Sequence, residues 1–127
     1  MATLIYLDTH VVAWLYMPRL DLLSETARSL IDEAELLISP AVRLELAYLA
    51  EIGRLKAGPN DVVQSLHAQL GLGVCTVDFA AVVDAALSLS WTRDPFDRLI
   101  VGHSIAGGHD LLTADATIRR EAPNAIW

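Results

Sequence analysis

The segment TLIYLDTHVVAWLY, residues 3–16, contains a short apolar run that passes directly into a helical pattern. The run is rich in strand-forming side chains and ends at Asp8, which predicts a short buried strand. The residues after it read as a short helix that is closed by Pro18. A strand that is apolar on both faces and leads into a helix is typical of a parallel sheet with helices packed on both sides.

The same alternation continues along the rest of the chain. Further strands are predicted at 35–39, 73–77 and 110–115, and 125–127 is a fifth candidate. Helices are predicted at 25–34, 40–53, from Asn60 or Asp61 to 70, 79–89, 95–106 and 116–121. This order predicts one α/β domain over residues 1–127, built as a three-layer sandwich with a central parallel sheet of four to five short strands.

The composition argues against a disordered chain, a membrane-spanning protein and a general polyanion-binding surface. Hydrophobic residues make up 54% of the 127 residues and charged residues 20%, a balance that excludes a disordered chain. No apolar run reaches the ~18 residues of a membrane span, so we expect no membrane partner. The apolar surplus instead predicts a protein interface. The net charge of −7 argues against a general polyanion-binding surface, but it permits carboxylates gathered around a metal ion.

Two features predict the cellular compartment. Cys75 is the only cysteine, so the sequence contains no disulfide framework. The first residues have no basic segment before their apolar run and no cleavage site, so they do not read as a signal peptide. Both features predict a protein of the reducing cytoplasm.

Glu45 lies on a helix whose apolar stripe is easily read. The stripe consists of Ala41, Val42, Tyr48, Leu49 and Ile52. Helical periodicity places Glu45 in the centre of this face, which predicts that it is buried. Glutamate is rarely buried unless it is paired or binds a metal. Two interpretations therefore stay open: a salt bridge to Arg43 or Arg98, or a metal ligand.

Aspartates are predicted to gather at one edge of the sheet. Asp8 ends the first strand, Asp115 comes two residues after the segment LLT of the fourth, and each also suits the cap of the next helix. Asp94 precedes a proline and is interpreted as a helix cap. Asp97, in the first turn of the same helix, shares a face with apolar residues. Because ligands bind beyond the carboxyl ends of parallel strands, we expect Asp8, Asp97 and Asp115 to meet there, within reach of Glu45.

Four carboxylates at one edge predict a bound cation. Neighbouring carboxylates repel and raise one another's pKa unless a cation neutralises them. Oxygen ligands favour Mg²⁺ or Mn²⁺, and such ions activate water and stabilise the leaving oxygen in phosphodiester hydrolysis. We therefore predict a metal-dependent phosphodiesterase.

Four motifs follow one another in a familiar order and spacing. They are YLDTHVVAWL at 6–15, SPAVRLELAYL at 39–49, RDPFDRLIVGHSI at 93–105 and LLTAD at 111–115. In these motifs the sequence resembles PIN-domain ribonucleases, specifically VapC-type toxins of bacterial or archaeal toxin–antitoxin pairs. The resemblance covers essentially the whole chain and implies a PIN-like fold.

The resemblance also implies roles for individual residues. The family's metal-binding and catalytic acids correspond to Asp8, Glu45, Asp97 and Asp115. Thr9 and Thr113 match small hydroxyl positions beside the metal site. Arg98 follows the third acid, where it would pair with a carboxylate or contact the substrate.

The activity implied by the resemblance is Mg²⁺- or Mn²⁺-dependent endonucleolytic cleavage of RNA. The implied partners are an RNA substrate, a cognate antitoxin, and a second copy of the chain in a homodimer or a toxin–antitoxin hetero-oligomer. The alternative is a degenerate PIN domain that only binds protein or RNA. A receiver domain would need a lysine at the end of a late strand, and the only lysine, Lys56, lies in a loop. A haloacid-dehalogenase-type phosphatase would need an aspartate at position 10, which is His10.

One histidine and the three tryptophans each allow two interpretations. His10 is close to Asp8 in the sequence and reads as an ordinary helix residue, with substrate contact as the alternative. Trp14, Trp91 and Trp127 suit either a core or an interface, and the sequence does not separate these two roles.

Overall fold

The computed structural model describes residues 3–127, and within them five strands form a single parallel sheet. The strands are β1 (Leu4–Leu7), β2 (Glu35–Ile38), β3 (Gly73–Val74), β4 (Asp110–Leu112) and β5 (Ala125–Ile126). Their order across the sheet is β3-β2-β1-β4-β5, and each neighbouring pair is parallel. The central strand, β1, is therefore hydrogen-bonded to β2 on one side and to β4 on the other.

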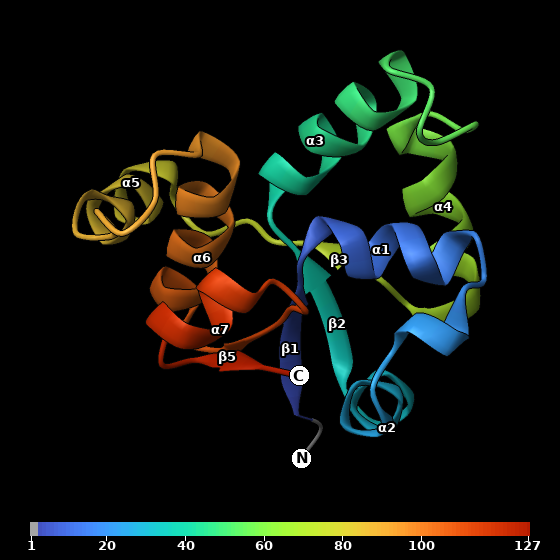
Figure 1. Ribbon diagram of the computed structural model, residues 1–127, viewed down its shortest axis with the longest axis horizontal. Coiled ribbons are helices and arrows are strands. Elements are labelled where there is room, and N and C mark those ends of the chain that lie inside the picture. The colour runs from blue at the N-terminus through green and yellow to red at the C-terminus, as the bar shows by residue number, and fades with distance from the viewer. Residues whose placement is uncertain (1–2) are drawn as a thin grey trace.

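Helices cover both faces of the sheet. They are α1 (Thr9–Tyr16), α2 (Glu25–Glu33), α3 (Pro40–Glu51), α4 (Pro59–Leu70), α5 (Phe79–Leu87), α6 (Pro95–Gly107) and α7 (Ala116–Glu121), with a short 3-10 helix, η1 (Leu20–Leu22), between α1 and α2. Figure 1 shows α1 to α4 on one side of the sheet and α5 to α7 on the other. Right-handed crossovers produce this division, because the chain moves one way from β1 to β3 and the opposite way from β3 to β5. The predicted α/β three-layer architecture is confirmed.

This reversal in strand order indicates where a ligand would bind. In open parallel sheets, ligands bind beyond the carboxyl ends of the strands, where the strand order reverses. Here the reversal lies between β1 and β4. Asp8 directly follows β1 and Thr113 directly follows β4, so both residues lie at this point.

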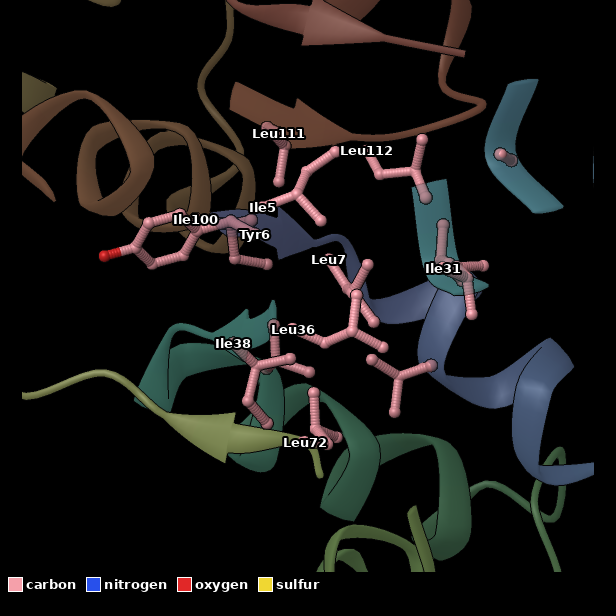
Figure 2. Packing of buried hydrophobic residues seen from close by; sticks show 14 of the residues in the cluster. Ile5, Tyr6, Leu7, Ile31, Leu36, Ile38, Leu72, Ile100, Leu111 and Leu112 are labelled. Carbon is pink, nitrogen blue, oxygen red and sulfur yellow. The ribbon is translucent and has the colours of Figure 1, made fainter. Parts of the chain in front are cut away.

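The core holds these strand ends in place. Figure 2 shows Ile5 and Leu7 of β1 between Leu36 of β2 and Leu111 of β4, with all four side chains in one apolar cluster. Helices α5 and α6 pack closely because Gly102 of α6 has no side chain, and a Cβ there would lie 3.0 Å from the carbonyl oxygen of Val82. The strands that lead to the site are therefore packed within the core.

Several predicted boundaries are wrong. Helix α4 begins at Pro59 with Gly58 at the N-cap position, and not at Asn60 or Asp61, because proline suits the first helical position. The strand predicted at 73–77 is only Gly73–Val74, at the edge of the sheet. The strand predicted at 110–115 ends at Leu112, which frees Thr113 and Asp115 to serve the site. The predicted bounds of α1 and α7 are confirmed, and the other helices and strands differ from the prediction by one or two residues at their ends, a normal spread for such boundaries.

None of the helices in residues 3–127 is long and apolar enough to cross a membrane.

Candidate active site

A polar pocket of about 290 Å³ lies at the carboxyl edge of the sheet. In Figure 1, α3 and α6 lie on either side of the end of β1 from which these lining residues extend. The pocket is lined by Asp8, Thr9, His10, Glu45, Leu49, Asp94, Asp97 and Asp115. The four acids expected from the sequence are thus brought together, from four separate segments of the chain.

Asp8 is the most deeply buried acid of the pocket, with 4% of its surface exposed. It is the N-cap residue of α1, and its Oδ1 accepts a hydrogen bond of 2.8 Å from the Thr9 amide. Its Oδ2 accepts a second one of 2.7 Å from the Thr113 hydroxyl. A buried carboxylate with hydrogen bonds to both oxygens is held in a single orientation.

Thr113 connects two of the acids. While its hydroxyl donates to Asp8, the same oxygen accepts a hydrogen bond of 3.1 Å from the Asp115 amide. Asp115 in turn caps α7, because its Oδ1 accepts a hydrogen bond of 2.9 Å from the Ile118 amide. The capping role considered for Asp115 is therefore real, and the residue lines the pocket as well.

Glu45 reaches the pocket from α3, but not from the centre of a buried face. Val42 and Leu46 are the buried residues of α3, whereas Tyr48 and Ile52 are 48% and 65% exposed. The prediction that Glu45 lies centrally in the buried face is therefore wrong: it is half-buried, beside that face. Its Oε1 accepts a hydrogen bond from the Thr9 hydroxyl.

The salt bridge considered for Glu45 is absent from the described residues. Arg43 bonds to Asn60 instead, at 2.9 Å. Burial raises the pKa of Glu45, and Asp8 and Asp94 raise it further, while the hydrogen bond from Thr9 lowers it. Glu45 is therefore a partly desolvated acid whose neighbours are other acids.

Asp94 and Asp97 enter from the start of α6. Asp94 is the N-cap residue, and its Oδ1 accepts hydrogen bonds from the amides of Phe96 and Asp97 at 2.8 and 3.3 Å. Burial raises the pKa of Asp97 from 3.8 to about 7, with further contributions from Asp94, Asp8, Asp115 and Glu45. The repulsion expected among clustered carboxylates thus falls mainly on Asp97.

Arg98 is directed away from this cluster. Its guanidinium donates three hydrogen bonds of 3.1 to 3.2 Å to the carbonyl oxygens of Ala86 and Leu87, at the end of α5. A cation at the carboxyl end of a helix satisfies free carbonyl groups and interacts favourably with the helix dipole. Within residues 3–127, Arg98 joins α6 to α5 and pairs with no carboxylate, so the carboxylate pairing considered for it is wrong.

The donor set suits a hard divalent cation. Carboxylate oxygens dominate the lining, and none of the described residues that line the pocket is a lysine or arginine. Within the described chain, no three acidic, histidine or cysteine side chains already converge closely enough to hold an ion. Binding would thus require the acidic side chains to move closer together than they lie here, which the repulsion among them opposes until a cation is present.

Sequence reasoning missed two contributors to the pocket. Asp94, interpreted only as a helix cap, lines the pocket and acts on the pKa of Asp97. Leu49 lines it as well, and so does His10, for which contact with the substrate was the alternative interpretation. The spacing of Leu49, four residues after Glu45 on the same helix face, is the signal that would have found it.

Comparison with known proteins agrees with this architecture. The PIN domain family matches residues 5–122. "Ribonuclease VapC22" of Mycobacterium tuberculosis is 35% identical over 132 residues, a match that covers 98% of this chain and 99% of that protein.

Solved structures share the fold at low sequence identity. VapBC2 from Rickettsia felis, bound to a DNA fragment from its promoter, superimposes with a TM-score of 0.70 at 19% identity, covering 98% of this chain and 96% of that one. A toxin–antitoxin complex from Klebsiella pneumoniae gives a TM-score of 0.66 at 12% identity, covering 97% and 96%. With the family match over most of its length and a full-length relative above 30% identity, this chain belongs to the PIN domain family.

Proposed function

We propose that this protein is a Mg²⁺- or Mn²⁺-dependent endoribonuclease that hydrolyses RNA phosphodiester bonds, and the toxin of a toxin–antitoxin pair. The observation that carries the proposal is the gathering of Asp8, Glu45, Asp97 and Asp115 in one pocket at the reversal point of the sheet. The full-length relative is named as a ribonuclease, and a structural neighbour is described as a toxin–antitoxin complex.

In this proposal, three of the acids bind the metal ion and the fourth supports it. Asp8, Glu45 and Asp97 hold the essential cation, and Asp115 contacts it directly, through water, or supports a second ion. When bound, the cation neutralises the carboxylates, polarises the phosphate and makes water a better nucleophile. Thr9 and Thr113 act indirectly, because their hydroxyls orient Glu45 and Asp8. Such supporting hydrogen bonds tune the orientation of metal ligands.

The proposed protein partners suit the apolar surface of α3. Leu44, Tyr48 and Ile52 repeat every four residues and are all exposed, so they form one uncovered stripe on the helix. A row of this kind favours a protein contact. We propose that an antitoxin and a second copy of the chain, in a homodimer or a hetero-oligomer, are the partners of this protein.

Cleavage of RNA by the purified protein tests the proposed activity. We expect endonucleolytic products in Mg²⁺ or Mn²⁺, none in EDTA, and none from Asp97→Asn in either metal. Asp94→Asn is the matched control, since asparagine also caps helices. It should keep most of the activity. If Asp97→Asn cleaves RNA like the wild-type protein, the proposed site is wrong.

Expression in cells identifies the substrate and separates the alternative function. Sequencing of RNA ends after induced expression should reveal new ends that are absent from a Glu45→Ala control. Binding of RNA without new ends in either protein would support the degenerate, binding-only PIN domain instead.

A further inference from the structure

A second hollow, of about 180 Å³, lies beside the carboxylate pocket and has aromatic walls. It is lined by His10, Trp14, Ala114 and Asp115. Two of these residues, His10 and Asp115, also line the carboxylate pocket. The two hollows therefore share a border, formed by His10 and Asp115.

The aromatic wall is held in place from several sides. His10 and Trp14 are one turn apart on α1, and their ring centroids are 4.9 Å apart with planes inclined at 55°. Trp127, which follows β5, lies edge-on to Trp14 at 6.0 Å and to His10 at 6.4 Å. These separations are those of favourable aromatic pairs. Trp14 is therefore a braced ring and only partly buried.

His10 is fixed by a hydrogen bond from the opposite side of the hollow. Its Nε2 accepts a hydrogen bond of 2.8 Å from the Ala114 amide. Its Nδ1 lies 3.7 Å from Oδ2 of Asp8. The ring thus forms a partition, with the carboxylates on one side and Trp14 on the other.

We propose that Trp14, braced by His10 and Trp127, is the stacking platform for a nucleobase next to the phosphate that is cleaved. The inference rests on the proposed function, because that function places a phosphate at the carboxylates. The base of the same or the next nucleotide then lies within reach of the adjoining hollow. Single-stranded RNA is commonly bound by stacking of its bases on aromatic side chains.

The charge of the hollow favours a base over a phosphate. Of the described residues that line it, none is a lysine or arginine, and Asp115 is acidic. A phosphate in this position would be repelled, whereas an uncharged planar base gains contact with the ring of Trp14. The hollow therefore accepts the part of a nucleotide that the carboxylate pocket does not.

Binding is tested by the fluorescence of Trp14 alone. The double variant Trp91→Phe and Trp127→Phe keeps only this tryptophan, and a matched variant, Trp14→Phe and Trp127→Phe, keeps only Trp91. Each is titrated with oligoadenylate RNA in Ca²⁺, which takes the same oxygen ligands as Mg²⁺, and a gel verifies that the RNA stays intact. We expect saturable quenching from Trp14 and none from Trp91. RNA binding is measured in parallel by fluorescence anisotropy. If RNA binds but does not quench Trp14, the proposed base subsite is wrong and the proposed function stands. If no variant binds RNA, both the subsite and the proposed function are wrong.

Kinetics distinguish stacking from a purely structural role. Trp14→Leu should lower kcat/KM for intact RNA by about 5- to 150-fold, the range that one base–aromatic stack supplies, and Trp14→Phe should lower it less. On RNA lacking the base beside the cleaved bond, wild type and Trp14→Leu should cleave at the same rate. Equal loss on both RNAs would show that Trp14 only supports the fold, and would contradict the proposal. The same equal loss together with weakened antitoxin binding would assign the hollow to a protein partner.

Discussion

Binding of Mn²⁺ should displace a proton from Asp97, and the number of protons follows from its raised pKa. Burial and four neighbouring acids raise that pKa from 3.8 to about 7. At pH 7 about half of the molecules therefore carry a proton on this carboxyl group. A carboxylate must lose its proton to bind a metal. We expect Asp97 to release about 0.9 proton at pH 6, about 0.5 at pH 7 and about 0.1 at pH 8.

Isothermal titration calorimetry measures this release directly. Mn²⁺ is titrated at each pH in two buffers that differ in ionisation enthalpy, and the difference in observed heat gives the number of protons. Asp94→Asn should bind Mn²⁺ and release fewer protons at pH 7. The reason is that, of the neighbouring acids, Asp94 makes the largest contribution to the raised pKa of Asp97. Release that stays constant from pH 6 to pH 8, or that Asp94→Asn leaves unchanged, would refute the reasoning.

The same pKa makes the stability of the metal-free protein depend on pH. Because the folded-state pKa of Asp97 is raised, folded molecules hold a proton between about pH 4 and pH 7 that unfolded molecules have lost. The stabilising effect of that proton is complete below about pH 4 and is lost as the pH rises to about 7. Glu45, whose pKa is also raised, acts in the same direction. Urea unfolding in EDTA should show this decline in wild type and a smaller one in Asp97→Asn, and equal declines would contradict it.

Three further substitutions test individual contacts by urea unfolding. Thr113→Val removes the hydroxyl between Asp8 and Asp115 and should cost about 1–3 kcal/mol of stability. It should also lower the affinity for Mn²⁺ about 10- to 100-fold. An unchanged affinity would show that this hydroxyl does not orient a metal ligand. Arg98→Ala removes the hydrogen bonds to the end of α5 and should cost about 1 kcal/mol, and no loss would mean that water replaces them. Gly102→Val places side-chain atoms against α5 and should cost about 1–3 kcal/mol; an unchanged stability would mean that the two helices separate freely.

Much of the site was predictable because the connectivity of a parallel sheet is restrictive. Asp8 directly follows a strand, and Asp97 lies in the first turn of a helix that returns to the sheet. The sequence therefore places both at the carboxyl edge without any knowledge of side-chain geometry. The α/β architecture followed for the same reason, from strands apolar on both faces.

Glu45 shows where periodicity misleads. Tyr48 and Ile52 belong to the apolar stripe that seemed to surround it, but both are exposed. Apolar residues at a protein-binding surface follow the same helical periodicity as apolar residues in the core. The predicted burial was therefore wrong, although the expectation that Glu45 reaches the other acids agrees with the pocket.

Individual contacts between distant residues had no signal in the periodicity of the sequence, although the resemblance placed Thr113 beside the site. The hydroxyl of Thr113 reaches Asp8 across 105 positions of the chain, and Ala114 reaches His10 across 104. Both contacts depend on the pairing of β1 with β4 and on the end of β4 at Leu112, a boundary that the sequence did not reveal. The aromatic hollow beside the acids depends on the same local geometry.

The location of Mn²⁺ in crystals, by anomalous scattering, tests the central claim most directly. We expect one strong peak among the carboxylates of Asp8, Glu45 and Asp97, and its loss in crystals of Asp97→Asn. An ion found elsewhere, in a protein whose RNA cleavage requires Mn²⁺, would contradict the assignment of these acids.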